Sequence, residues 1–97
     1  MTLSDLKASI KDPLHPTGLS VPLQALWYAA HGNWEKAHHL AQDDKSPEAA
    51  WVHAHLHRQE GDISNARYWY TRAGKDTSGL DLKKEWDEIA RALLERP

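Results

Sequence analysis

Apolar residues recur at three- and four-residue intervals along most of this chain, and residues that start or end helices bound each run. The clearest run precedes Gly74 and consists of Ile63, Ala66, Trp69, Tyr70 and Ala73. This spacing places these side chains on one face of an α-helix. Gly74 then permits the left-handed backbone conformation with which many helices end. The pattern therefore predicts a helix that stops at this glycine.

A second helix is predicted directly before the first. Ser46 can cap its N-terminus, and Pro47 suits the first helical position, where its missing N–H group costs nothing. No further proline and no glycine interrupts the segment before Gly61, and Asp62 can then cap the next helix. Two helices joined by so short a turn lie antiparallel. The sequence thus predicts a helical hairpin over residues 46–74.

The same pattern occurs once more upstream. Ser20 can cap a helix, and Gly32 with Asn33 repeats the turn that precedes the later helix. Gly32 and Gly61 are 29 residues apart. The small residues that align at this offset are Ala25 with Ala54 and Ala37 with Ala66. A repeat of this length is typical of helical-repeat arrays, so we expect a first hairpin over residues 20–45.

Further helices are predicted at both ends of the chain. Leu3, Leu6 and Ile10 share one face of a short N-terminal helix, and the prolines that follow favour an extended connection. After a polar loop, the final helix has an apolar side formed by Leu82, Trp86, Ile89, Ala90 and Leu93. Its acidic residues, Glu85 among them, are expected to face solvent.

These elements predict an all-α fold of five to six helices, built from antiparallel helical hairpins. The length suits a single domain over residues 1–97. Its predicted parts are an N-terminal helix with an extended connection (1–19), the first hairpin (20–45), the second hairpin (46–74), and a loop with a C-terminal capping helix (75–97).

Composition and charge exclude several classes of function. The chain has no cysteine, so no thiol nucleophile is available. The net charge is −2, with acidic and basic residues interspersed, which argues against binding of nucleic acid or of an anionic membrane. No basic segment followed by a long apolar run begins the chain. We therefore expect a cytoplasmic protein.

Histidines form the main candidate for chemistry. On a helix, His53 and His57 lie on one face one turn apart, a spacing that can hold a divalent metal, and Glu60, His31 or His38 could complete the site. The same face is the one that the repeat pattern buries, where both rings could be neutral, hydrogen-bonded core aromatics. We favour the second interpretation and expect no metal or other cofactor. No triad or phosphate-binding loop is apparent, and we expect no enzyme activity.

A different face of the same helix carries Trp51, His55 and Arg58, which follow one another at four- and three-residue steps. Tryptophan and arginine are enriched at interaction hot spots. We therefore predict that these residues bind a partner. In the alternative, Trp51 packs under the final helix and Arg58 merely covers it.

The paired hairpins resemble those of tetratricopeptide-repeat (TPR) proteins. Ala25 and Ala54 match the small residue of the family's first helix, and Tyr28 matches an aromatic position that is His57 in the second copy. Positions in the family's second helix are matched by Ala37, Ala66, Tyr70 and Ala73. The resemblance implies a TPR-like right-handed α-α superhelix that binds a protein or peptide on the face lined by first helices. It implies no chemistry.

The sequence thus predicts a small non-catalytic scaffold or adaptor that binds a protein or peptide partner. A metal-dependent or histidine-based enzyme that uses the His53/His57 face is the alternative. A third interpretation is a homodimer, since two repeats leave exposed ends that can pair.

Overall fold

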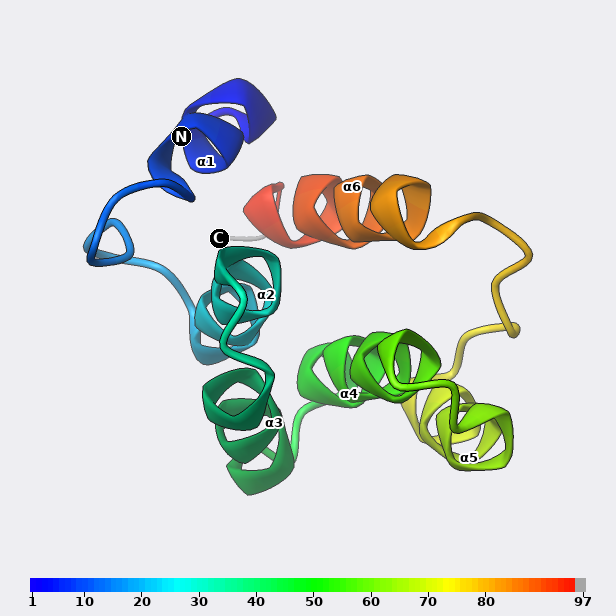
Figure 1. Cartoon of the computed structure of the whole chain (residues 1–97). Helices are drawn as coiled ribbons and strands as arrows, with labels where there is room; N and C mark the ends of the chain where they lie inside the picture. The colour runs from blue at the N-terminus through cyan, green and yellow to red at the C-terminus, as the bar shows by residue number, and fades with distance from the viewer. Residues whose placement is uncertain (96–97) are drawn as a thin grey trace.

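The computed structural model describes residues 1–95, so residues 96–97 of the predicted domain lie outside it. This part of the chain contains six helices and no strand. The helices are α1 (Leu3–Ser9), α2 (Val21–His31), α3 (Trp34–Asp43), α4 (Pro47–Gln59), α5 (Ile63–Ala73) and α6 (Leu82–Leu94). The predicted all-α class is therefore confirmed (Figure 1).

The turns inside the two hairpins have the same geometry. Gly32 and Gly61 have left-handed φ angles of 94° and 81°. After each glycine, a backbone N–H bonds back to the preceding helix at 2.9 Å, from Asn33 to Tyr28 and from Asp62 to His57. The side chains of Asn33 and Asp62 then cap α3 and α5. Both sequence motifs thus fold into one kind of turn.

Helix α4 is the centre of the structure. Its residues from Ala49 to His57 are all buried, and it packs against α2, α3, α5 and α6. In Figure 1, α4 lies in the middle of the molecule with α6 above it. Every polar side chain in this stretch is therefore enclosed by protein.

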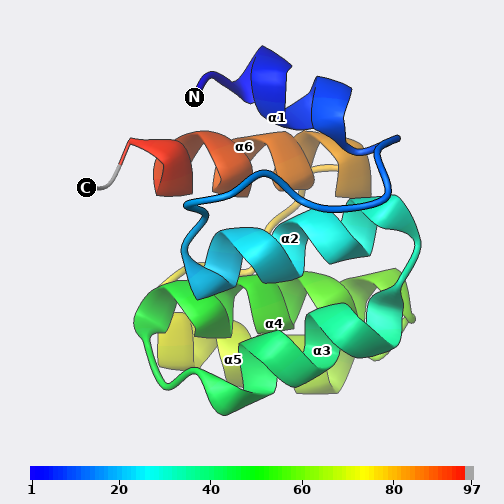
Figure 2. The same cartoon turned by 90° about the vertical axis from the view of Figure 1, so that its left-hand side faces the viewer.

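Helix α6 lies between α1 and the first helices of the hairpins, α2 and α4 (Figure 2). The indole Nε1 of Trp86 donates to the Leu26 carbonyl of α2 at 2.8 Å. On the other side of α6, Lys7 of α1 forms an ion pair with Asp87 at 3.1 Å. The last helix thus covers the face on which the TPR resemblance places a partner.

None of the described helices combines the length and the apolar character needed to cross a membrane.

Alanines allow the close approach of the hairpin helices, because Ala54 and Ala66 are completely buried in the same core cluster. Replacing Ala54 with leucine should lower the free energy of unfolding by about 1–3 kcal/mol, since the added atoms overpack the core. Chemical denaturation followed by circular dichroism measures the effect. Ala8, exposed on α1, is the matched control, and Ala8→Leu should be nearly neutral. A neutral Ala54→Leu variant would contradict this packing.

Candidate functional site

Three histidines from the two hairpins meet in one cluster. His38 comes from α3, and His53 and His57 come from successive turns of α4. Each ring offers one nitrogen, and these nitrogens all lie within 4.8 Å of one another. His53 and His57 are 2% and 6% exposed, and His38 is half-buried. The burial that the sequence pattern predicted for His53 and His57 is confirmed.

Two tryptophans hold the cluster in place. The ring of Trp69 stacks on His53 with a centroid distance of 3.8 Å, and Trp34 stacks on His38 at 4.8 Å. The indole N–H of Trp34 donates to the Leu56 carbonyl at 2.9 Å, which fixes the position of that ring. Flat aromatic surfaces therefore cover His53 and His38.

The hydrogen bonds of the cluster define the roles of its nitrogens. The Nε2 atoms of His38 and His53 are 3.0 Å apart, so one ring donates to the other. The Nδ1–H group of His57 donates to the Glu60 carboxylate at 2.6 Å, which leaves the lone pair on Nε2. The Nδ1 atom of His53 is buried and has no hydrogen-bond partner among the described residues.

The environment favours the neutral form of His38 and His53. Burial, with the adjacent His38 and His57, lowers the pKa of His53 to about 3. Burial and His57 also lower the pKa of His38, although the nearby Glu60 carboxylate opposes this shift. Neutral rings retain lone pairs, which are what a metal ion would require.

The sequence named two histidines as candidates to join His53 and His57, and the structure brings only one of them close. His38 contacts both rings. His31 lies elsewhere: it stacks on Trp27 at 4.4 Å and its Nδ1 is 2.7 Å from the Ile10 carbonyl oxygen. Glu60 joins the cluster through His57, as the sequence suggested.

A second polar group surrounds the carboxylate of Glu85, which is completely buried. His55 Nδ1 and Arg58 donate to one carboxylate oxygen at 2.7 Å and 2.8 Å, and the Tyr70 hydroxyl donates to the other. Arg58 also donates to the Leu80 carbonyl at 2.7 Å. This network joins α4, α5, α6 and the loop before α6.

The expectation that Glu85 faces solvent is wrong. Its three-residue spacing from Leu82 and four-residue spacing to Ile89 place it within the apolar stripe of α6. That spacing could have identified Glu85 as buried. Its partners could not have been identified in this way, because they come from α4 and α5.

Burial raises the pKa of the Glu85 carboxyl, but hydrogen bonds from His55 and Tyr70 outweigh this effect, so the pKa lies below its usual value. Burial and Glu85 also raise the pKa of the Tyr70 hydroxyl.

Trp51, His55 and Arg58 do share one side of α4, but that side is covered. Trp51 is 7% exposed, and the ammonium of Lys75 lies 4.3 Å from the centre of its ring. His55 and Arg58 are engaged by Glu85 of α6. The strip is therefore covered by α6 and the preceding loop, whereas partner binding requires it to be exposed. Its role in partner binding stays a prediction.

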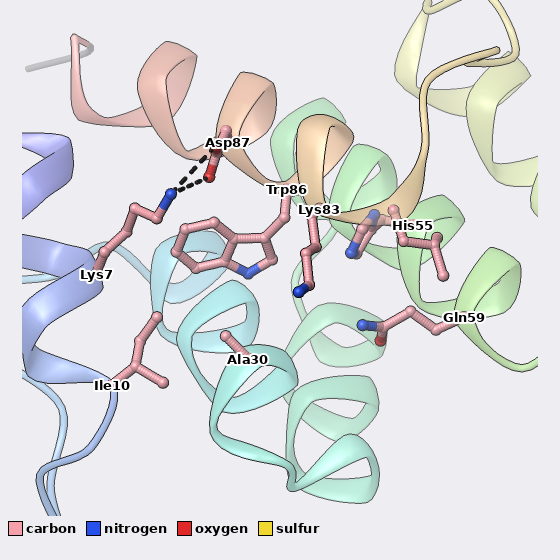
Figure 3. A pocket seen from close by; sticks show the side chains of 9 residues that line it. Lys7, Ile10, Ala30, His55, Gln59, Lys83, Trp86 and Asp87 are labelled. Atoms are coloured by element: carbon pink, nitrogen blue, oxygen red, sulfur yellow. Dashed lines mark hydrogen bonds and ion pairs between the residues drawn. The ribbon is translucent and has the colours of Figure 1, made fainter.

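A cavity of about 430 Å³ lies between α1, α2, α4 and α6. Figure 3 shows Trp86 and His55 on its walls, with the Lys7–Asp87 ion pair at one side and Lys83 at the other. The Nε2 atom of His55 is buried and has no hydrogen-bond partner among the described residues. The cavity has room for a small molecule and is lined by both apolar and cationic groups.

Comparisons of the chain with protein-family models, with curated proteins and with solved structures found no match. The resemblance to TPR proteins therefore stays a prediction from residues such as Ala25 and Ala54.

The Glu85 network should make the fold sensitive to loss of one charge. Glu85→Gln should lower the free energy of unfolding at pH 7 by about 3 kcal/mol, because Arg58 and its neighbours lose a buried anion. The pKa of Glu85 is lower in the folded protein than in the unfolded chain. Ionised Glu85 therefore stabilises the fold at pH values above the unfolded pKa, and this stabilisation is lost as the pH falls through the folded pKa. The variant should therefore lose less stability than the wild type between pH 5 and pH 3. Glu88→Gln, an exposed change on the same helix, is the control. Equal stability of the two variants would contradict the network.

The neutral histidines predict a separate pH effect in the metal-free chain. Because the folded pKa of His53 lies below the unfolded value of about 6.5, the unfolded state binds protons that the folded state does not. The free energy of unfolding should therefore be larger at pH 8 than at pH 5. Glu85 stays ionised over this range, because its pKa is lowered, and does not contribute to the difference. Urea denaturation at both pH values measures the loss. His39→Ala should show the same loss, because His39 is exposed. Equal stability at both pH values would show that the cluster is not held neutral.

Proposed function

We propose that the chain is a small non-catalytic scaffold that binds a protein partner, with its two hairpins arranged as a TPR-like superhelix. Equivalent turns at Gly32 and Gly61 support this arrangement. So does the complete burial of the paired alanines, Ala25 and Ala54.

The observation that carries the proposal is the outer face of α5. Tyr68 is 52% exposed, and the guanidinium of Arg72 lies 5.8 Å from its ring centre and 5.5 Å from that of Trp69. Arg72 also donates to the Tyr68 hydroxyl at 3.2 Å. Tyrosine and arginine are residue types enriched at protein interaction hot spots, and here the two contact each other on an exposed face.

The charge of this face specifies the chemistry of the partner. Helix α5 carries Arg67 and Arg72 and no acidic residue. Arg67, Tyr68 and Arg72 are all exposed. We infer that the partner presents an acidic segment with an apolar side chain that packs on Tyr68.

This surface differs from the Trp51, His55 and Arg58 strip predicted from the sequence. Those residues already contact this chain's own α6 and the loop before it. A partner would reach them only after α6 had moved away, whereas α5 packs mainly against α4 and leaves Tyr68 52% exposed.

Replacing Tyr68 with alanine, or reversing the charge in Arg72→Glu, should weaken partner binding by at least about tenfold, which corresponds to 1.4 kcal/mol. Both side chains are exposed, so the fold should be unchanged by circular dichroism. Chemical cross-linking and mass spectrometry of complexes from native lysate would identify the partner and the contacting segment. Affinity is then measured with that purified partner.

The control is Arg91→Ala, which removes an exposed arginine from a different helix. The proposal is supported if one partner, cross-linked to α5 through an acidic segment, binds the wild type and this control but not the α5 variants. A partner retained by both α5 variants would contradict it. Recovery of a second copy of this chain would instead favour the homodimer.

A further inference from the structure

We propose that His38, His53 and His57 bind one divalent transition-metal ion, with zinc as the fitting member of that class. The three rings converge from α3 and α4, and one nitrogen of each lies within 4.8 Å of the others. Imidazole nitrogen is a preferred ligand of Zn²⁺ in proteins. This site goes beyond the proposed scaffold function and uses none of the residues assigned to partner contact.

The distances are close to those of a metal site. A zinc–nitrogen bond is about 2.1 Å, so two ligands of a tetrahedral ion lie about 3.4 Å apart. The Nε2 atoms of His38 and His53 are 3.0 Å apart. Two imidazole lone pairs cannot face each other so closely unless a proton or a cation lies between them. The pair therefore has the separation at which a metal can replace the shared proton.

The third ligand is oriented by a carboxylate. The Nδ1–H group of His57 donates to Glu60 at 2.6 Å, so its remaining lone pair is on Nε2. Metal-binding histidines commonly donate their other N–H to a carboxylate, which fixes the ring and increases its basicity. Glu60 thus supplies the second contact that a metal-binding His57 needs.

The surroundings favour a dry and rigid site. Trp69 and Trp34 stack on His53 and His38, and His53 is 2% exposed. An apolar shell of this kind limits the access of water to a metal. Three protein ligands leave one position of a tetrahedral ion open, as in zinc sites that bind water.

Untagged, chelator-treated protein is titrated with ZnCl₂ by isothermal calorimetry at pH 7.5, and with CoCl₂ by visible spectroscopy. We expect one ion per chain, a rise in melting temperature on adding zinc, and the intense visible bands of tetrahedral cobalt. His38→Ala and His57→Ala should each weaken binding by about 100-fold or more. Glu60→Gln should weaken zinc binding by about 10- to 100-fold, because the Nδ1–H group of His57 loses its charged acceptor.

The matched control is His39→Ala, which removes the exposed neighbour of His38. It should bind zinc like the wild type. The proposal is overturned if the wild type binds no zinc saturably at micromolar concentration, or if His39→Ala loses as much affinity as His38→Ala. Because His38 is half-buried, circular dichroism is measured for its variant. Should that variant unfold, His38→Gln replaces it in the same comparison.

Discussion

The hydrogen bonds to the buried carboxylate of Glu85 determine how the helices are joined. An ionised carboxylate can remain in a protein interior only when donors satisfy it. Here the donors come from α4 and α5, through His55, Arg58 and Tyr70, while Glu85 itself belongs to α6. Moving α6 along its axis by one turn would separate all of these groups, so the network fixes the register of the last helix on the hairpins.

Helix α4 illustrates a related constraint. A helix that is covered on every side has no face left for polar residues, yet α4 contains His53, His55 and His57. Each of these rings has a hydrogen-bond partner from a different position: His38, Glu85 and Glu60, respectively. Histidine suits such places because a neutral imidazole both packs as an aromatic ring and exchanges specific hydrogen bonds. Two of these contacts, with His38 of α3 and Glu85 of α6, join α4 to other helices and so favour their observed pairing.

The sequence was sufficient for the local structure. Capping residues such as Ser20, Ser46 and Asp62 marked the helix starts, and glycines such as Gly61 marked the turns, because these effects act within a few residues. The same periodicity placed His53 and His57 together on a buried face.

The position of α6 could not be decided in this way. The loop between α5 and α6 has no repeating pattern, so the sequence left open whether the final helix covers Trp51 or leaves it to a partner. The path of α6 over α2 and α4 explains why Glu85 is buried, against our expectation, and why the strip at Trp51 is covered. Sequence periodicity shows which face of a helix is buried, but it does not show which helix covers it.

The position of α6 also has a consequence for how the chain folds. Each hairpin closes through neighbouring residues, as in the Asp62 to His57 bond, whereas Trp86 bonds to Leu26 and Lys7 pairs with Asp87, 60 and 80 residues apart in sequence. Local contacts form before distant ones, because closing a long loop costs more chain entropy. The hairpins are therefore the early units of folding, and α6 with α1 docks last. Undocking of α6 would uncover the Trp51 side of α4 without unfolding either hairpin, but it would break the Glu85 network.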